Sequence, residues 1–308
     1  MKTLFGGFEG KRSVRCVVLC AAALTAFSAA GYCGANSFAE ILTAEPSVRA
    51  NGMGNAYTAA DGDVFGAYYN PAHTVKTAKI GFVFQRGYAD DNTGAVGIAL
   101  PMGPFQLGLS TLYYDGGNMD LYSPGGYLGS VKAEKDYVGL VSLACKMGPL
   151  SLGVNGKYVR EELFEAVSAG AFTGDAGILL ETPLINLGAA AQNLTGGFNF
   201  GNEMENFRKT LRAGAYKQFG GDALSLSAAF DLVKTDGMEL SKRLGAEVSI
   251  AKLIALRGGY QFGASGGSQN GAVAFGFGAR LGALAVDYAL VPNKDLGATH
   301  KAGLTIGF

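Results

Sequence analysis

The sequence predicts an all-β fold: a transmembrane antiparallel β-barrel of about 14 strands, preceded by a short, partly helical plug segment. Two observations support this prediction. After residue 78, apolar residues alternate with small or polar ones, and the alternation runs to an aromatic residue at the last position, Phe308. An apolar stretch preceded by basic residues stands at the other end of the chain. A period of two belongs to β-strands, so one set of side chains faces a hydrophobic environment and the other faces water.

The composition agrees with a membrane barrel. Charged residues make up 16% of the 308 residues, below the share of about a quarter that is usual in soluble proteins. Gly contributes 48 residues and Trp none, so aromatic residues at the membrane interfaces must be Tyr and Phe. The formal net charge of +0 leaves no basic excess to hold phosphates. We therefore expect no nucleic-acid partner.

Residues 1–35 indicate a secretory signal peptide. An apolar run spans residues 17–30, and small residues follow it. The run is shorter than the ~20 residues that a spanning helix needs, which makes an uncleaved membrane anchor the weaker alternative. Cleavage is expected after Ala30 or after Ala35. The basic residues that precede the run are Lys2, Lys11, Arg12 and Arg15.

Residues 78–308 are predicted to form the barrel. On the last strand Ala302, Leu304 and Ile306 alternate with small or polar neighbours, and the pattern recurs along the chain. Short turns at one end of a barrel and longer loops at the other are normal in outer-membrane proteins. A closed barrel also leaves no unpaired strand edge in lipid. We predict short turns at residues 101–104, 146–149 and 219–222, and polar or Gly-rich loops at residues 115–132, 193–206 and 263–271.

Residues 36–77 lack this alternation and are rich in small side chains. We predict that they form a plug or hatch inside the barrel; a disordered periplasmic leader is the alternative. Met53, Tyr57 and the alanines around them have helical spacing and predict one short helix. Pro71 fixes its own φ and biases Asn70 towards an extended conformation, so this pair is expected to redirect the chain into the first strand.

Six charged residues share the wet face of neighbouring predicted strands. A basic group on the lipid face would cost ~2–4 kcal/mol at the bilayer midplane, so these side chains are expected inside the barrel. They either form a paired network that holds barrel and plug together, which we favour, or line a polar path. The six residues are Asp231, Glu247, Arg257, Arg280, Asp287 and Lys301.

The motifs in this chain do not predict an enzyme. Residues 263–267 fit the G-x-S-x-G motif around Ser265, and Asp287 and His300 follow in hydrolase order. That motif requires a strand–turn–helix context, which the Gly-rich sequence does not predict. The alternation also places Asp287 and His300 on opposite faces. With only 2 His in the chain, a His-based metal site is not expected, and we predict no catalytic, cofactor-binding or metal-binding residue.

Three parts of the chain resemble the PorV/PorQ family of FadL-like outer-membrane proteins, also grouped as UPF0164. The N-terminal part is Ser-Val-Arg-Ala-Asn-Gly-Met-Gly-Asn-Ala at 47–56, followed by Ala-Asp-Gly-Asp at 60–63 and Tyr-Asn-Pro-Ala at 69–72. The middle part is Ala-Ala-Ala-Gln-Asn-Leu at 189–194, and the closing strand pair matches at 287–292 and 296–301. His73 stands where Gly is more usual, and Gly62 interrupts what is commonly an Asp-Asp pair.

The resemblance implies a fourteen-stranded barrel with an N-terminal hatch in the bacterial outer membrane. It implies transport of hydrophobic small molecules, such as long-chain fatty acids, as the expected function. The alternatives are a surface scaffold or shuttle for type IX-type protein secretion and a structural barrel with a filled lumen. The expected partners are outer-membrane lipid, hydrophobic solutes or secreted cargo proteins, and the barrel-assembly machinery, for which Phe308 is part of the assembly signal.

Overall fold

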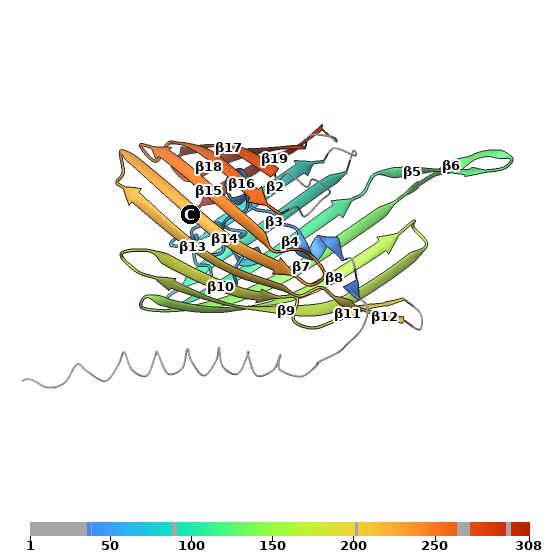
Figure 1. Cartoon of the computed structure of the whole chain (residues 1–308), viewed down its shortest axis with the longest axis horizontal. Helices are drawn as coiled ribbons and strands as arrows, with labels where there is room; N and C mark the ends of the chain where they lie inside the picture. The colour runs from blue at the N-terminus through green and yellow to red at the C-terminus, as the bar shows by residue number, and fades with distance from the viewer. Residues whose placement is uncertain (1–35, 38, 88–90, 201–202, 264–271, 294–296) are drawn as a thin grey trace, which may run out of the picture.

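Fourteen strands among the described residues of this computed structural model close into an antiparallel barrel (Figure 1). The structure describes residues 36–37, 39–87, 91–200, 203–263, 272–293 and 297–308. The predicted signal peptide, with cleavage after Ala30 or Ala35, lies outside the described residues. The last strand pairs with the first, which closes the barrel. The prediction of an antiparallel barrel of about 14 strands is confirmed.

The barrel strands follow one another in the chain, with each pairing to its neighbour. They are β2 (Lys79–Arg86), β3 (Asn92–Met102), β4 (Phe105–Asp115), β7 (Glu134–Met147), β8 (Leu150–Leu163), β9 (Val167–Glu181), β10 (Asn186–Gln192), β13 (Thr210–Gly220), β14 (Leu224–Thr235), β15 (Ser241–Ile250), β16 (Ile254–Phe262), β17 (Ala272–Leu281), β18 (Leu284–Asn293) and β19 (Gly297–Gly307). Eight further elements lie outside the wall or within the lumen and are introduced below.

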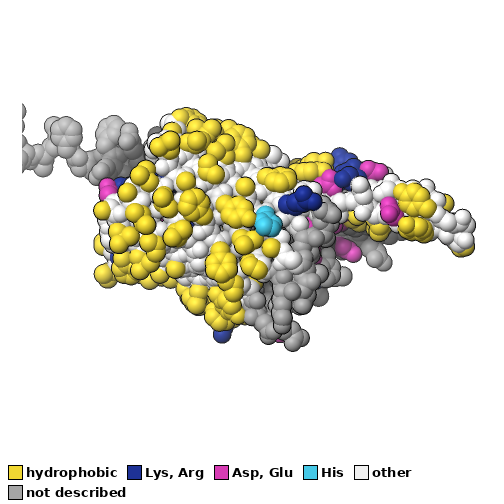
Figure 2. Space-filling model, turned by 90° about the horizontal axis from the view of Figure 1, so that it is seen from above, with side chains coloured by type: hydrophobic (Ala, Val, Ile, Leu, Met, Phe, Trp, Pro, Cys, Tyr) yellow, Lys and Arg dark blue, Asp and Glu magenta, His cyan; other side chains and the backbone are white. Residues whose placement is uncertain are grey.

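The outer face of the barrel is apolar, as the alternation predicted. On β2, Phe82 and Phe84 are exposed, while Gly81 between Ile80 and Phe82 faces Phe65 inside the barrel. Figure 2 shows hydrophobic side chains spread over the wall, with few charged ones between them. Such a surface is costly in water, at roughly 25 cal/mol per Å² of apolar area, and favourable in lipid. The closed barrel and its apolar face place the protein in the outer membrane.

The two ends of the barrel differ in the length of their connections. At one end, which we call the short-turn end, links such as those between β3 and β4 and between β7 and β8 contain two residues. At the opposite end, the long-loop end, β4 and β7 are joined through residues 116–133, and β10 and β13 through residues 193–209. The long-loop end is the extracellular end in outer-membrane barrels.

Two segments that were predicted as loops contain strands. Residues 115–132 include the hairpin β5 (Asn118–Ser123) and β6 (Gly126–Lys132), which projects away from the barrel (Figure 1). Residues 193–206 include β11 (Gly197–Phe200) and most of β12 (Glu203–Phe207), which pair with each other, and β12 also pairs with β1 (Asn36–Ser37). The prediction of plain loops was wrong because polarity and glycine content do not prevent two short neighbouring segments from pairing as strands.

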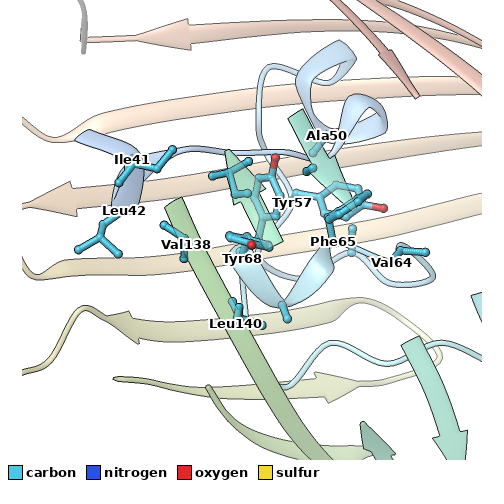
Figure 3. Packing of buried hydrophobic residues seen from close by; sticks show 14 of the residues in the cluster. Ile41, Leu42, Ala50, Tyr57, Val64, Phe65, Tyr68, Val138 and Leu140 are labelled. Atoms are coloured by element: carbon cyan, nitrogen blue, oxygen red, sulfur yellow. The ribbon is translucent and has the colours of Figure 1, made fainter. Parts of the chain in front are cut away.

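Residues 39–75 pack inside the barrel. They include the 3₁₀-helix η1 (Glu40–Thr43), the α-helix α2 (Val48–Gly52) and the 3₁₀-helix η2 (Gly66–Tyr68). Their apolar side chains share one buried cluster with inward residues of the strands, and Figure 3 shows Tyr68 beside Val138 and Leu140 of β7. No helix in the described part of the chain is long and apolar enough to cross a membrane. We call residues 39–75 the N-terminal segment.

The position predicted for the helix was wrong. The helix α2 ends at Gly52, before the Met53 and Tyr57 positions whose spacing suggested it. Ser47 begins it, because its hydroxyl accepts a hydrogen bond from the Ala50 amide at 3.1 Å. Gly54, with φ of 61°, turns the chain into a left-handed conformation, which ends regular helix and which glycine adopts without strain.

Candidate functional site

The N-terminal segment lies directly against the barrel wall at glycines. A side chain at Gly54 would place its Cβ 2.7 Å from the backbone nitrogen of Tyr260. A Cβ at Gly52 would lie 2.9 Å from the Cα of Gly276 on β17. No real Cβ tolerates such distances, so glycines on both surfaces are what allow the two backbones to touch. This contact brings charged groups of the wall within reach of the segment.

Asp231 binds the segment through its backbone. This residue lies on β14 and is fully buried. Its Oδ2 accepts hydrogen bonds from the amides of Tyr57 and Thr58, both at 2.9 Å, and from the Thr58 hydroxyl at 2.6 Å. Three donors on one carboxylate oxygen make a strong anchor, because hydrogen bonds to charged groups are about twice as strong as neutral ones.

Charges of alternating sign connect the segment to three strands. Arg49 of α2 donates from Nη2 to Glu247 on β15 at 2.8 Å, and from Nε to the same carboxylate at 3.0 Å. Arg257 on β16 donates to Glu247 at 2.5 Å and to Asp287 on β18 at 2.6 Å. Each charge therefore has a partner of opposite sign, which offsets the cost of taking it out of water. Of the six inward charges singled out in the sequence, Glu247, Arg257 and Asp287 are joined in this way, and Arg49 links them to the segment.

Glu45 makes a second ionic contact, nearer the long-loop end. Its carboxylate pairs with both Arg212 on β13 and Arg243 on β15, and its carbonyl oxygen accepts a hydrogen bond from Lys301 at 2.8 Å. Burial alone would raise the pKa of Glu45, but Arg243 and Arg212 outweigh it and hold the pKa below its ordinary value. These groups border a polar cavity of about 210 Å³, which Gln192 also lines. Arg212 Nη1 has no hydrogen-bond partner among the described residues.

Asn70 and Pro71 lie against Gly153 on β8 and Gly177 on β9. The Asn70 amide nitrogen donates to the carbonyl oxygens of Thr58 at 2.9 Å and of Ile178 on β9 at 3.0 Å. Its side-chain oxygen accepts from the Ala72 amide at 3.0 Å, which bends the chain after Pro71. Asn70 therefore ties two parts of the segment to each other and to the wall. The turn lies several residues before β2, whose first residue is Lys79.

The other residues that the sequence singled out lie in different environments. Met53 and Tyr57 are fully buried in the packed core, so they do not line an open groove. Arg280 shares the inward register of β17 but is exposed at the short-turn end. Phe308 is exposed beside β19, and its amide donates to the Ala78 carbonyl at 2.9 Å. Its proposed part in assembly stays a prediction.

The three residues of the hydrolase-like order do not form a site in the described structure. Asp287 points inward to Arg257. His300 is exposed on the outer wall, where its Nδ1 lies 2.6 Å from the hydroxyl of Tyr288. Ser265 lies outside the described residues. The opposite faces predicted for Asp287 and His300 agree with these positions.

His73 is buried within the N-terminal segment with both ring nitrogens satisfied. Nε2 accepts a hydrogen bond from the Asp63 amide at 2.9 Å, which leaves Nδ1 as the donor to the Ala60 carbonyl at 3.0 Å. The ring occupies the space that a side chain at Gly66 would need. Burial lowers the pKa of His73, and this effect outweighs the opposing influence of Asp61 and Asp63. His73 is therefore neutral in the folded protein.

The neutral His73 predicts a loss of stability in mild acid. A group whose pKa is lowered by folding contributes stability that is complete above its unfolded pKa and is lost as the pH falls towards the folded pKa. For His73 the loss begins near the ordinary value of 6.5. We expect the thermal unfolding midpoint of wild type to fall as the pH drops from about 8 to about 5, and the fall to be smaller in His73→Gln.

The chain offers a matched control for this experiment. His300→Gln removes the other histidine, which is exposed on the outer wall, and should keep the wild-type pH dependence. An equal pH dependence in wild type and His73→Gln would show that other groups cause it.

The outer wall carries an apolar groove. It has a volume of about 740 Å³ and lies over β3, β4, β7, β8 and β9. The floor of the groove consists of small residues at outward positions, such as Thr111, Gly139 and Gly156. Larger apolar side chains form its sides. Because these positions face the membrane, the groove suits an acyl chain or another apolar molecule.

Sequence reasoning missed several of the residues that anchor the segment. Arg243 stands two positions before Gly245 and shares the inward face with Glu247, so the alternation alone would have found it. Glu45 and Arg49 precede the first barrel strand and carry no periodic signal. Only the folded chain brings them to their partners, because Arg49 and Glu247 are 198 residues apart.

A closed barrel with an apolar outer face and a chain segment packed inside it defines an outer-membrane barrel with a filled lumen. No protein-family model and no curated protein sequence matches the chain. The toluene transporter TbuX of Ralstonia pickettii has a similar structure, with a TM-score of 0.61, 13% identity, and coverage of 85% of this chain and 98% of that one.

Two further solved structures are similar to this chain. The CymD monoaromatic hydrocarbon channel matches with a TM-score of 0.61 and 14% identity, over 85% of this chain and 97% of that one. A FadL homologue of Pseudomonas aeruginosa matches with a TM-score of 0.52 and 13% identity, over 85% of this chain and 98% of that one. At these identities the likeness concerns the fold, which is that of FadL-like outer-membrane barrels.

Proposed function

We propose that this protein carries hydrophobic small molecules across the outer membrane. The observation that carries the proposal is the fold shared, over 85% of the chain, with barrels named as a toluene transporter and a monoaromatic hydrocarbon channel. The packing inside the barrel agrees with it, because residues of the N-terminal segment from Ala39 to Ala72 share one buried cluster with inward side chains of the strands and occupy space that an aqueous path for polar solutes would need. The apolar groove on the outer wall offers a surface on which such a molecule could rest at the membrane.

Uptake in cells tests the transport proposal. The chain is expressed in a Gram-negative host that lacks its own transporters for hydrophobic solutes, and uptake of labelled toluene and labelled oleate is measured separately. We expect faster uptake of at least one probe, with no change for a polar sugar of similar size. An inserted, heat-modifiable barrel that accelerates neither probe would contradict the proposal. Toluene without oleate would indicate aromatic substrates, and the reverse would indicate fatty acids.

The second candidate function is a surface scaffold or shuttle for secreted proteins, as the sequence resemblance to the PorV/PorQ family implies. The hairpin β5–β6 favours it, because it projects from the long-loop end and exposes Tyr122 by 71% and Leu128 by 68%. Large aromatic and apolar side chains at an exposed tip are typical of protein interaction sites. Deleting residues 119–131 separates the two functions: a scaffold loses cargo release at the surface, whereas a transporter keeps its uptake.

A further inference from the structure

Three carboxylates gather at the long-loop end of the barrel interior, apart from the anchors described above. Glu134 and Asp136 lie on β7, and Glu161 lies on β8 directly opposite Asp136. One ligand oxygen from each residue lies within 4.8 Å of the others. Like charges placed directly opposite on paired strands destabilise the pair. A cluster of this kind therefore requires compensation by a cation or by protons.

Asp136 distinguishes this cluster from an ordinary acidic surface. Its side chain is 1% exposed, and its Oδ1 has no hydrogen-bond partner among the described residues. Among the residues that the structure describes, no Lys or Arg forms an ion pair with any of the three carboxylates. The nearby lysines are paired elsewhere: Lys132 with Asp115 at 2.8 Å, and Lys135 with Glu165 at 3.0 Å.

The surroundings of the cluster do not neutralise it. The next inward cation on β8 is Lys157, which is buried and ion-paired with Asp175 at 2.8 Å. Fully buried Val159 stands between Lys157 and Glu161 on the inward face. Two further acidic residues of the long-loop end, Glu40 and Glu205, add to the negative field at the cluster.

We propose that Glu134, Asp136 and Glu161 form a divalent-cation site that takes Ca²⁺. Calcium prefers carboxylate, carbonyl and water oxygens, with about six to eight ligands at roughly 2.3–2.6 Å. Three carboxylates supply the charge, and the half-buried Glu134 and Glu161 leave space on their solvent side for water ligands. Mg²⁺ demands a tighter octahedral geometry and gives up its water reluctantly, so it binds this site more weakly. The bound ion links β7 to β8.

Terbium luminescence tests the site directly, since Tb³⁺ occupies oxygen-ligated calcium sites and emits when a nearby aromatic ring is excited. Tyr114 on β4 pairs with Asp136 in the strand register, and the chain contains no Trp to mask its contribution. In folded, detergent-purified protein we expect sensitised emission that Ca²⁺ displaces at lower concentration than Mg²⁺. Tyr114→Phe should reduce this emission while leaving calorimetric Ca²⁺ binding unchanged.

Carboxylate variants decide whether the signal comes from this cluster. We expect Asp136→Asn and Glu161→Gln each to weaken Ca²⁺ binding by about tenfold or more, as even the loss of a supporting group at a metal site does. Glu162→Gln changes the adjacent carboxylate, which points to the other face and lies 3.9 Å from Arg160, and should bind Ca²⁺ like wild type. Both Asp136 and Glu161 are replaced, so that the result does not depend on one variant that folds poorly.

A thermal measurement completes the experiment and checks that each variant is folded. A ligand that binds only the folded state raises the unfolding midpoint. Ca²⁺ should therefore stabilise wild type and Glu162→Gln, and Asp136→Asn much less. Absence of calcium binding to wild type at neutral pH would overturn the proposal and would mean that protons neutralise the cluster. Unchanged binding in both Asp136→Asn and Glu161→Gln would also overturn it. These results do not depend on the transport proposal.

Discussion

Deleting residues 36–61 is expected to leave an inserted barrel that conducts small polar solutes. The deleted stretch includes Glu45, which meets Arg212 at the long-loop end, and ends at Asp61, one residue before Gly62, whose carbonyl oxygen accepts a hydrogen bond from Lys79 at 2.5 Å at the short-turn end. The deletion removes β1 and its pairing with β12, but the strand pairing of the barrel and the lipid-facing side chains remain untouched. The charged wall residues that lose their partners become hydrated in the opened lumen. Solute influx into liposomes should rise from near background to the level of an open pore.

A deletion outside the lumen provides the control. Removing residues 119–131 takes away most of the hairpin β5–β6, which projects away from the barrel (Figure 1), and should leave influx at the wild-type level. If the barrel without residues 36–61 inserts but stays impermeable, the remaining residues or the loops close the lumen. If it does not insert, the segment is needed for assembly, and the proposed hatch role must be revised.

Replacing Asp231 with Ala should release the middle of the N-terminal segment. The change removes the acceptor for the Tyr57 and Thr58 amides and for the Thr58 hydroxyl. A buried donor left without a partner costs about 1–3 kcal/mol. The Thr58 hydroxyl can rotate to another acceptor but the two amides cannot, so we expect a loss of roughly 2–6 kcal/mol in the docking of the segment. Hydrogen exchange at residues 55–60 should become much faster, and solute influx should rise by less than in the deletion variant.

Two further variants interpret this result. Asp231→Asn retains one acceptor oxygen without the charge and should have an intermediate effect. Asp222→Ala removes an aspartate that is exposed in a turn and pairs with exposed Lys252, and such surface pairs contribute little. It should leave exchange and influx unchanged. Equal exchange rates at residues 55–60 in Asp231→Ala and wild type would show that Arg49, Glu45 and Asn70 hold the segment without this anchor.

The barrel could be predicted from the sequence because each of its strands divides lipid from lumen. The alternate spacing of apolar residues is enough to place them on the lipid face, as for Phe82 and Phe84 on β2 and for Leu304 and Ile306 on β19. The N-terminal segment has no such constraint. Its helix lies at Val48–Gly52, where a cap at Ser47 and a left-handed Gly54 set the limits. A count of apolar spacing therefore placed the helix several residues too late.

Only the barrel side of the candidate site could be predicted from the sequence. Inward register identified Asp231, Glu247 and Arg257 as lumenal, and each of them contacts another charge or the segment. Their partners on the segment, Glu45 and Arg49, could not be identified because the contacts join residues far apart in the chain. The acidic cluster around Asp136 was also missed, since register alone does not show that a carboxylate lacks a counter-charge.

The packing of the N-terminal segment bears on how the barrel closes during folding. Val48 lies against Gly303 on β19, while Phe65 lies against Gly81 on β2, so one segment touches both strands of the closing seam. β2 and β19 are the most distant pair along the chain, and closing such a loop carries an entropic cost that grows with its length. The segment is covalently joined to β2. Once it has docked on β19, the first strand is already held beside the last, and the seam forms as a local step rather than by a long search.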